Sequence, residues 1–304
     1  MRVHGQRQRA RWAVGPRGSS RLRRLIPGPI RRVGGALALG LAFLTHLAVA
    51  APQVSAVSNR WWKGNLHTHT FWSDGDDFPE MVVSWYKRHG YHFLALSDHN
   101  TLQEGERWLT IGNPRTADAL RKYLARFGPD WVEQRITEDY HKVRLKTLAE
   151  FRGEFEEPGR FLLIPSEEIT DAFAHSSGRV PVHVNATHLR ALIKPAGGAS
   201  VLDVLQRNIN AVLAQRRSTG QPMIPHIAHP NFGWAITAED LMRVQGERFF
   251  EVYNGHPAVH NEGGADQPST DRLWDIALAF RLGELRLGPL FGLAVDDAHQ
   301  YHGF

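Results

Sequence analysis

Asn65-Leu66-His67-Thr68-His69-Thr70 places two histidines one residue apart on a segment with strand character. Side chains alternate between the two faces of a strand, so His67 and His69 point to the same side. Both rings can therefore reach one metal ion. A similar spacing returns near the end of the chain, in Asp297-Ala298-His299. Two such pairs predict that segments far apart in sequence meet at one metal site.

Further candidate ligands follow between these two pairs. They lie in Ser73-Asp74-Gly75, Asp98-His99, Glu167-Glu168, His183 and His229-Pro230. A Ser-Asp-Gly turn can fold a carboxylate back over a strand end, and an unpaired carboxylate at the end of an apolar strand would be costly. Each residue alone is as readily structural as functional. Together they provide more ligands than one metal ion binds, and they indicate a metal-dependent hydrolase.

The basic charge of the chain resides in its first 50 residues. Lys and Arg outnumber Asp and Glu by 36 to 31, but residues 1–50 contain ten arginines and no acidic residue. The other 254 residues therefore carry a net charge of −5. A basic pI of this origin does not indicate nucleic-acid binding. The length of residues 51–304 suits one large α/β domain.

Residues 1–50 have the features of an export signal. The arginines precede an apolar run that ends in Ala48-Val49-Ala50, which predicts a signal peptide cleaved after Ala50 and a periplasmic or extracellular domain of residues 51–304. Arg31-Arg32 resembles a twin-arginine signal. An uncleaved anchor is the alternative, but the run is short for a span and His46 interrupts it. After cleavage we expect no stable membrane insertion.

Strand-like and helix-like patterns alternate after residue 60. We expect strands at 61–70, 92–96, 161–165, 180–187, 222–228, 249–253 and 290–295, and helices at 79–89, 200–217, 237–244 and 269–282. This alternation predicts parallel strands covered by helices. Most candidate ligands follow strand ends, where α/β barrels build active sites. Residues 104–159 interrupt the pattern, and we predict a helical insertion there, with helices at 117–127 and 131–155.

These motifs resemble, in order, those of the PHP family, the polymerase and histidinol phosphatase superfamily of metal-dependent phosphoesterases. The corresponding segments are His67-Thr68-His69, Ser73-Asp74-Gly75, Asp98-His99, Glu167-Glu168-Ile169-Thr170, His183, His229-Pro230 and Asp297-Ala298-His299. Ile169-Thr170 favours Glu168 over Glu167 as the ligand. The most similar group is that of exported, carbaryl-hydrolase-like metallohydrolases, so phosphatase activity does not follow automatically.

The resemblance implies an α/β fold, a distorted (β/α)7 barrel, with two or three divalent metal ions. The implied ligands form three groups: His67, His69, Glu168 and Asp297; Asp74, His99 and His299; and Glu168, His183 and His229. Glu168 would bridge the first and third groups.

The chemistry of this ligand set agrees with the resemblance. The chain has no cysteine, and imidazole with carboxylate suits Zn, Mn or Fe. Neighbouring ions would supply an activated hydroxide at neutral pH, with Asp297 as the catalytic proton acceptor. Asp98 could orient a ligand from behind. The expected function is an exported hydrolase that cleaves a small-molecule phosphoester, or a related ester or carbamate, with no nucleic-acid partner.

Two alternatives stay open at this point. An amidohydrolase-type barrel also begins with His-x-His, but it usually adds a strand-end lysine, and no lysine here occupies such a position. A catalytically silent metal-binding module is the second. The sequence does not indicate an oligomeric state.

Three further features qualify the interpretation. The chain ends five residues after His299, earlier than barrels of this family, so truncation at the C-terminus and closure of the barrel are open questions. His226 lies three residues from His229 on the same expected strand and should not share its face. Asn254-Gly255-His256 follows an expected strand and is a candidate for the pocket wall.

Overall fold

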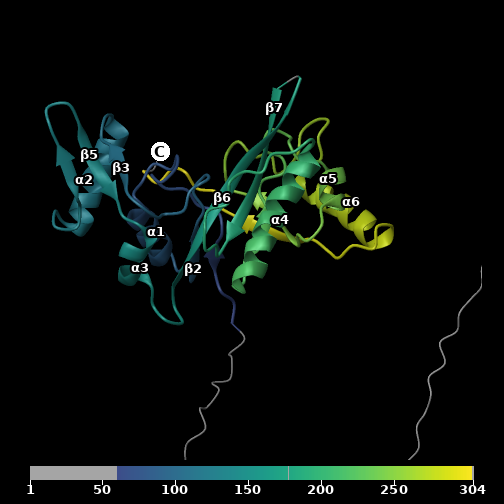
Figure 1. Ribbon diagram of the computed structural model, residues 1–304, viewed down its shortest axis with the longest axis horizontal. Helices are drawn as coiled ribbons and strands as arrows, with labels where there is room; N and C mark the ends of the chain where they lie inside the picture. The colour runs from purple at the N-terminus through teal and green to yellow at the C-terminus, as the bar shows by residue number, and fades with distance from the viewer. Residues whose placement is uncertain (1–59, 177, 303–304) are drawn as a thin grey trace, which may run out of the picture. The chain divides into compact units, whose positions relative to one another are not determined.

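The structure, a computed structural model, describes residues 60–176 and 178–302 and is built around a seven-stranded sheet (Figure 1). In spatial order the strands are β1 Gly64–Asn65, β2 Phe93–Leu96, β6 Leu162–His175, β7 Gly178–Thr187, β8 Ile224–Ile227, β9 Phe249–Asn254 and β10 Phe291–Val295. Neighbouring strands are parallel except around β7, which runs antiparallel to both β6 and β8.

The two outer strands of this sheet meet at one end. Ala298, just after β10, pairs in parallel with Thr68, just after β1. The His69 N–H donates to the Ala298 carbonyl at 3.0 Å, and the Asp297 N–H donates to the His67 carbonyl at 3.0 Å. The sheet is thereby curled into a nearly closed barrel. The predicted α/β barrel is confirmed, and the residues of the final motif make the closing contacts themselves.

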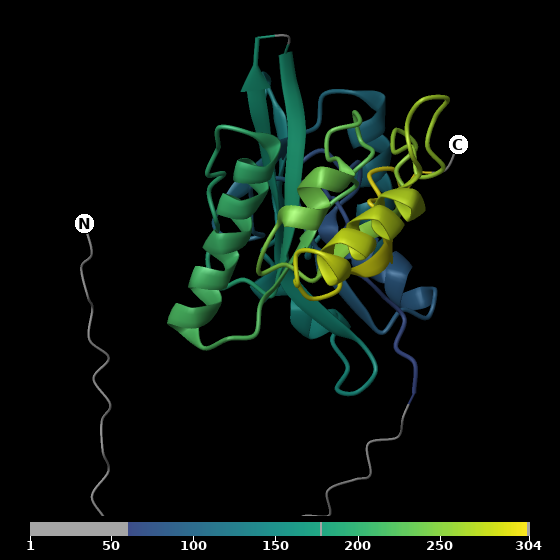
Figure 2. The ribbon, with the colours of Figure 1, turned by 90° about the vertical axis from the view of Figure 1, so that its right-hand side faces the viewer.

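Helix α4, Val201–Thr219, covers the outer side of β6, β7 and β8 (Figure 2). It begins at the N-cap Ser200, whose side chain accepts from the Asp203 N–H, and it ends at Gly220 with φ +69°. Apolar side chains three and four positions apart, such as Leu205, Ile209 and Val212, are fully buried. Burial of each stabilises the fold by about 1.5–3 kcal/mol, so this helix anchors the strands that position three of the nine candidate ligands, Glu168, His183 and His229.

Three further helices flank the sheet close to where the sequence predicts them. They are α1 Pro79–Arg88, α5 Ala238–Arg243 and α6 Thr270–Gly283. Thr237 caps α5 and Ser269 caps α6 through side-chain oxygens. Each cap lies at the start of an apolar periodic segment, which is why the sequence locates these helices well.

The insertion between β2 and β6 contains the helix predicted at 117–127, but the prediction of one helix at 131–155 is wrong. It contains helices α2 Pro114–Phe127 and α3 Leu148–Phe155 and a separate antiparallel sheet of β3 Arg107–Thr110, β4 Gln134–Ile136 and β5 His141–Leu145. The predicted helix at 131–155 is therefore two strands followed by one short helix. The sequence His141-Lys-Val-Arg-Leu145 alternates polar and apolar residues, and Val143 and Leu145 are fully buried. Period two marks a strand.

Strand β6 is much longer than the expected 161–165, and the strand after it is not parallel. β6 and β7 form one hairpin whose pairing runs from Ser166–Thr187 to His175–Gly178, and Figure 1 shows it extending past the rest of the sheet. Glu167 and Glu168 suggest a strand end because carboxylates are rarely buried. Both are fully buried here, and the next subsection identifies their partners.

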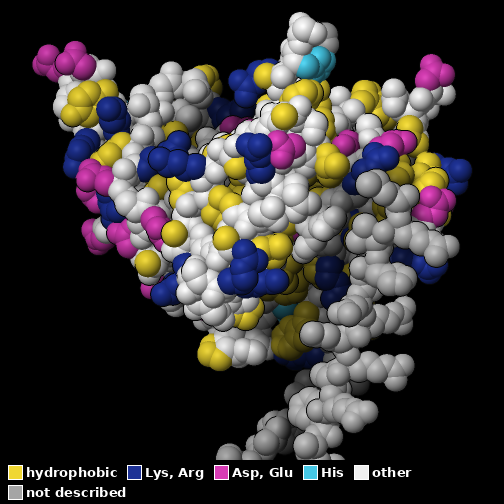
Figure 3. All heavy atoms as spheres, turned by 45° about the vertical axis from the view of Figure 1, so that its right-hand side comes forward, with side chains coloured by type: hydrophobic (Ala, Val, Ile, Leu, Met, Phe, Trp, Pro, Cys, Tyr) yellow, Lys and Arg dark blue, Asp and Glu magenta, His cyan; other side chains and the backbone are white. Residues whose placement is uncertain are grey.

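The described residues form a single compact unit, and none of their helices is long and apolar enough to cross a membrane. On the face drawn in Figure 3, basic side chains are scattered among acidic and apolar ones. The predicted signal peptide, residues 1–50, lies outside the described residues.

Candidate metal centre

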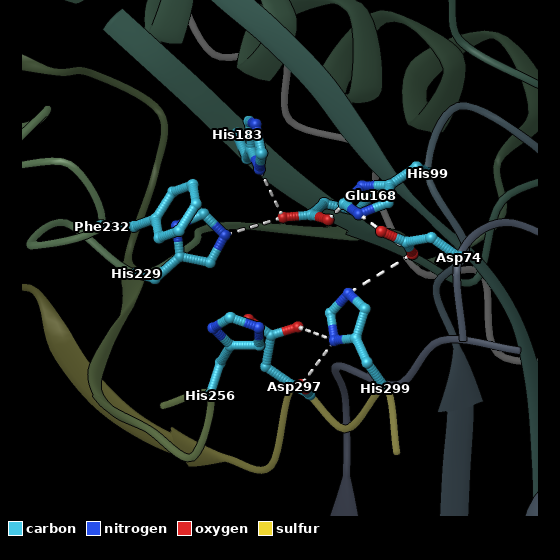
Figure 4. A pocket seen from close by; sticks show the side chains of 9 residues that line it. All are labelled: Asp74, His99, Glu168, His183, His229, Phe232, His256, Asp297 and His299. Atoms are coloured by element: carbon cyan, nitrogen blue, oxygen red, sulfur yellow. Dashed lines mark hydrogen bonds and ion pairs between the residues drawn. The ribbon is translucent and has the colours of Figure 1, made fainter. Parts of the chain in front are cut away.

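A cavity of about 170 Å³ opens at the end of the barrel where most of the ligand motifs lie (Figure 4). Seven of the nine predicted ligands line it: Asp74, His99, Glu168, His183, His229, Asp297 and His299. The other two, His67 and His69, are fully buried beside them. The structure therefore brings all nine predicted ligands together from six segments of the barrel.

The Ser73-Asp74-Gly75 turn folds back over the segment that carries His69, as its residue types predict. The Gly75 N–H donates to the Thr70 carbonyl at 3.1 Å. A Cβ atom at Gly75 would lie 2.6 Å from the carbonyl group of His69, so only glycine allows this approach. The turn thereby places Asp74 at the rim of the cavity.

Asp98 fixes this turn from behind. Its Oδ1 accepts from the Thr70 N–H at 2.7 Å and from the Ser73 hydroxyl at 2.6 Å. It was expected to orient a metal ligand, and it contacts no ligand ring directly: Ser73, whose hydroxyl it accepts from, lies 3.4 Å from His69 Nδ1.

The first predicted group converges on one point. Asp297 Oδ1 lies 3.2 Å from His67 Nε2 and 3.1 Å from His69 Nε2. Glu168 lies 3.4 Å from His67 Nε2 and 3.6 Å from His69 Nε2. His67 Nε2, His69 Nε2, Glu168 Oε2 and Asp297 Oδ1 are all buried, and none has a hydrogen-bond partner.

Four unsatisfied polar atoms at one buried point need an explanation, because each would destabilise the fold by about 1–3 kcal/mol. A divalent cation is the species that two imidazole nitrogens and two carboxylate oxygens would satisfy together. The residues present therefore fit the metal ion that the resemblance implies.

The second predicted group surrounds Asp74. Its Oδ1 lies 3.4 Å from His299 Nε2 and 3.5 Å from His99 Nε2. The ring of His69 stacks on that of His299, with centroids 4.0 Å apart, and contacts the tilted ring of His99, with centroids 4.3 Å apart. The ligand atoms of these four residues can reach a common ion, so His69 joins the trio that the sequence predicts.

The third predicted group is centred on Glu168. Its Oε1 lies 2.9 Å from His183 Nδ1 and 2.9 Å from His229 Nε2, contacts that Figure 4 draws. Its Oε2 lies at an ion-pair distance of 2.7 Å from His99 Nδ1, although the hydrogen bond of that nitrogen is with Thr170 Oγ1. Glu168 thus contacts residues from all three predicted groups, as a bridging ligand must.

Two of these residues hold strained backbone conformations. His229 has φ +22° and Asp297 has φ +47°. Such conformations cost about 1–3 kcal/mol each and cluster at functional sites. Here they turn the chain sharply after β8 and β10, which aims both side chains into the cavity.

The charges of the site balance one another in the metal-free protein. Burial alone would raise the pKa of Glu168, but His183 and His67 hold that pKa well below its usual range. Burial alone would lower the pKa of His67. The negative charges of Asp297, Glu251 and Glu168 outweigh the effect of burial and raise that pKa. For both residues, the attraction between buried imidazoles and carboxylates thus outweighs the effect of burial.

Glu251 is a functional residue that the sequence analysis missed. It is fully buried in the middle of β9. Its Oε1 lies 2.7 Å from His67 Nδ1 and 3.0 Å from His226 Nε2, and its Oε2 accepts from the His229 N–H at 2.8 Å. A carboxylate on Nδ1 directs the Nε2 lone pair of His67 toward a metal ion. The available signal was an acidic residue inside the apolar strand 249–253.

Replacing Glu251 with glutamine should weaken metal binding about 10- to 100-fold, the range measured for groups that orient a ligand. Glutamine keeps the size but can present its amide N–H to His67 and release the imidazole from its fixed tautomer. Titration of the metal-free protein with Zn²⁺ or Mn²⁺, followed by calorimetry, measures the change. An unaltered affinity would show that packing alone orients His67.

Two neighbours of predicted ligands lie apart from the cavity. Glu167 points to the other face of β6, where it accepts from the Ile193 N–H at 2.7 Å. His226 is fully buried behind the site against Glu251 and does not line the cavity. The structure therefore separates Glu168 from Glu167 and His229 from His226 as the sequence predicts.

Comparisons with known proteins found one curated relative, which matches part of the chain, and solved structures of low identity. No family model matches the sequence. The chain is 28% identical over 126 residues to the DNA polymerase/3'-5' exonuclease PolX of Bacillus subtilis, which covers 40% of this chain and 20% of that protein. The chain thus spans about a fifth of the length of this curated relative.

Two solved structures are similar at low identity. One, from Bacteroides vulgatus, is a two-domain protein described as containing a predicted PHP-like metal-dependent phosphoesterase (19% identity, 79% of this chain, 52% of that chain, TM-score 0.39). The other, from Bifidobacterium adolescentis, is provisionally described as a metal-dependent phosphoesterase (14% identity, 79% of this chain, 88% of that chain, TM-score 0.39). Neither likeness supports a conclusion about activity.

The motif residues keep the family order along the chain, and the barrel gathers all of them at one end. Glu168 lies where a bridging ligand is required. In its motifs, its barrel-like sheet and its cluster of candidate metal ligands, the chain resembles the PHP family.

Proposed function

We propose that this protein is an exported metal-dependent hydrolase that cleaves a phosphoester or a related ester or carbamate. One observation carries the proposal: four buried ligand atoms without hydrogen-bond partners face one another beside two further groups of ligands. Six histidines and three carboxylates are enough for two or three divalent ions, and without thiolates they favour Zn, Mn or Fe. Bound ions would supply Lewis acidity and lower the pKa of a water molecule.

The chain's own residues are arranged to move a proton. Asp297 Oδ2 accepts from the Asn254 amide at 3.0 Å, which fixes the carboxylate, while Oδ1 remains without a partner at the cavity. Asp297 is therefore the residue that accepts a proton from the attacking water. His183, His229 and Glu168 form the opposite wall of the cavity in Figure 4 and limit the substrate to a compact reacting group.

The amidohydrolase alternative finds little support in the site. No lysine is among the residues that line this cavity in the described part of the chain. The silent metal-binding module differs from an enzyme in activity rather than in geometry, so a measurement of turnover separates them.

A substrate panel with the metal-loaded protein tests the proposal. We expect metal analysis to find two or three ions per chain, and we expect one or more of p-nitrophenyl phosphate, bis(p-nitrophenyl) phosphate, p-nitrophenyl acetate and an aryl carbamate to be hydrolysed. Activity should vanish on chelation and return with Zn²⁺ or Mn²⁺. A metal-loaded protein that turns over none of these esters would favour the silent module, and a protein that binds no metal would refute the proposal.

Export and membership of the carbaryl-hydrolase-like group are parts of the same proposal. Export rests on residues 1–50, with their arginines followed by an apolar run and Ala48-Val49-Ala50. Amino-terminal sequencing of the protein from a periplasmic or medium fraction tests it. A mature chain that begins at Ala51 supports export, and retention of residues 1–50 in the cytoplasm contradicts it. Turnover of the aryl carbamate tests the subgroup.

A further inference from the structure

His256 lines the cavity but belongs to none of the candidate metal clusters of the described residues. It follows β9 in the loop that the sequence marks as a pocket wall. In Figure 4 it lies beside Asp297 and His299, with His183 and Glu168 on the other side of the cavity. Its ring centroid is 5.0 Å from that of His299 and 6.2 Å from that of Phe232.

The loop fixes the position of this histidine. A Cβ atom at Gly255 would lie 2.7 Å from the Asp296 carbonyl oxygen, so the glycine lets the loop pack directly on the end of β10. The His256 N–H donates to Asn254 Oδ1 at 2.8 Å, and the His256 carbonyl accepts from the Val259 N–H at 3.0 Å. The same Asn254 side chain donates to Asp297. One residue therefore sets the distance between His256 and the catalytic carboxylate.

The loop also fixes which ring nitrogen carries the proton. The Ala258 N–H donates to His256 Nδ1 at 3.2 Å. A nitrogen that accepts a hydrogen bond is unprotonated, so the neutral ring carries its hydrogen on Nε2. With Nδ1 occupied as an acceptor, Nε2 is the N–H donor that the ring offers at the cavity wall.

We propose that His256 binds the substrate, by donating a hydrogen bond from Nε2 to an oxygen of the ester group that reacts at the metal centre. The ligand class is an ester with a free acceptor oxygen on phosphorus or carbon, and the adjacent Phe232 ring provides an apolar surface for its organic part. This inference rests on the proposed function. A fixed N–H donor beside a charged centre is a common way to hold a developing oxyanion.

Three variants of the full-length, metal-loaded protein test the proposal. His256→Phe removes the donor and keeps a ring, and His256→Gln retains an N–H near the position of Nε2. His260→Phe is the matched control, because His260 lies in the same loop, stacks on Trp234 at 4.7 Å and does not line the cavity. Metal content by mass spectrometry, kcat/KM on the best ester of the panel and the Kd of inorganic phosphate are measured for each.

We expect His256→Phe to keep its metal ions but to lose about 100-fold in kcat/KM, the usual effect of removing one such donor. The Kd of inorganic phosphate should rise in parallel. His256→Gln should recover most of both losses, and His260→Phe should match the wild type.

Distinct results overturn the proposal. Loss of metal from His256→Phe would make His256 a ligand, and unchanged kcat/KM with unchanged phosphate binding would make it a bystander. If the wild type hydrolyses no ester, the proposed function fails, and phosphate binding still reports on His256. A metal-loaded wild type that neither turns over an ester nor binds phosphate contradicts both.

Discussion

Replacing Glu168 with alanine is expected to abolish activity and to remove most of the bound metal. Glu168 is the carboxylate on which the site converges, since it lies within 3.6 Å of a nitrogen of five histidines: His67, His69, His99, His183 and His229. Its removal would leave the first group with three ligands and the third with two. We expect kcat to fall by at least about 1,000-fold, because electrostatic stabilisation by bound ions is lost with them.

The chain offers a closely matched control at the preceding residue. Glu167 is equally buried in the same strand but faces away from the site, and burial raises its pKa to about 8 despite the hydrogen bond that it accepts from the Ile193 N–H. It is therefore uncharged at neutral pH, and Glu167→Gln should preserve the fold, the metal and the activity. Metal analysis and steady-state kinetics on both variants separate the two roles. If both variants lost the same amount of metal and activity, the effect of the Glu168 substitution would come from disturbing a buried carboxyl group and not from removing a metal ligand.

The ligands were predictable because their signals are local. Each motif places polar residues at the end of an apolar strand: His-x-His, Ser-Asp-Gly, Asp-His and Asp-x-His. Burying such residues without partners is costly, which favours a binding role for them. The order of the motifs along the chain resembles that of the PHP family. The helices α1, α4, α5 and α6 were predictable for the same reason, since each carries its own cap or apolar period.

The parts that the sequence did not predict depend on distant partners. The length of β6 follows from its pairing with β7. No local sequence pattern predicts that pairing. The role of Glu251 needs His67, which is 184 positions away in the chain. The strands of the insertion were obscured by a run of charged residues around Val143, although their period of two was visible. Contacts between residues far apart in sequence, rather than the secondary-structure propensity of each segment, determine these features.

Closure of the barrel could not be predicted from the sequence, because it also depends on a contact between distant residues. Thr68 and Ala298 are the central residues of the two x-His motifs, and they pair with each other while the candidate ligands on either side of them face the cavity. The alternation that points His67 and His69 to the site frees the backbone of Thr68 for the bridge. The first and last motifs are thus one structural unit, in which closing the sheet and assembling the site are the same event. Folding of the barrel end and metal binding should accordingly be coupled.

That coupling leads to the second large effect: metal ions should stabilise the protein strongly, and more so as the pH rises. At a free concentration about 1,000 times its Kd, one ion stabilises the native state by about 4 kcal/mol. For a chain of this size each kcal/mol raises Tm by about 2–4 °C. Chelation should therefore lower Tm by roughly 10 °C or more for each site emptied.

The pH dependence follows from the protons that metal ions must displace. Burial lowers the pKa of His99, but Asp74 and Glu168 outweigh it and raise that pKa to about 10. In the metal-free protein this proton stabilises the fold fully below the unfolded pKa of about 6.5, and the contribution is lost as the pH rises toward 10. Metal ions compete with the same proton, so their binding strengthens over the same range. The lowered pKa of Glu168 and of Asp297 affects stability only in acid.

The difference in Tm between the loaded and the chelated protein should thus widen between pH 6.5 and 8.5, and metal uptake near pH 7 should release protons. Calorimetric titration in buffers of different ionisation enthalpy counts those protons, and thermal unfolding with and without chelator gives the Tm difference. Glu167→Gln, which keeps the ligands, should behave as the wild type does, whereas Glu168→Ala should show almost no difference between the two conditions. A Tm difference that shrinks as the pH rises would mean that the imidazoles of this site are not the groups that bind the metal.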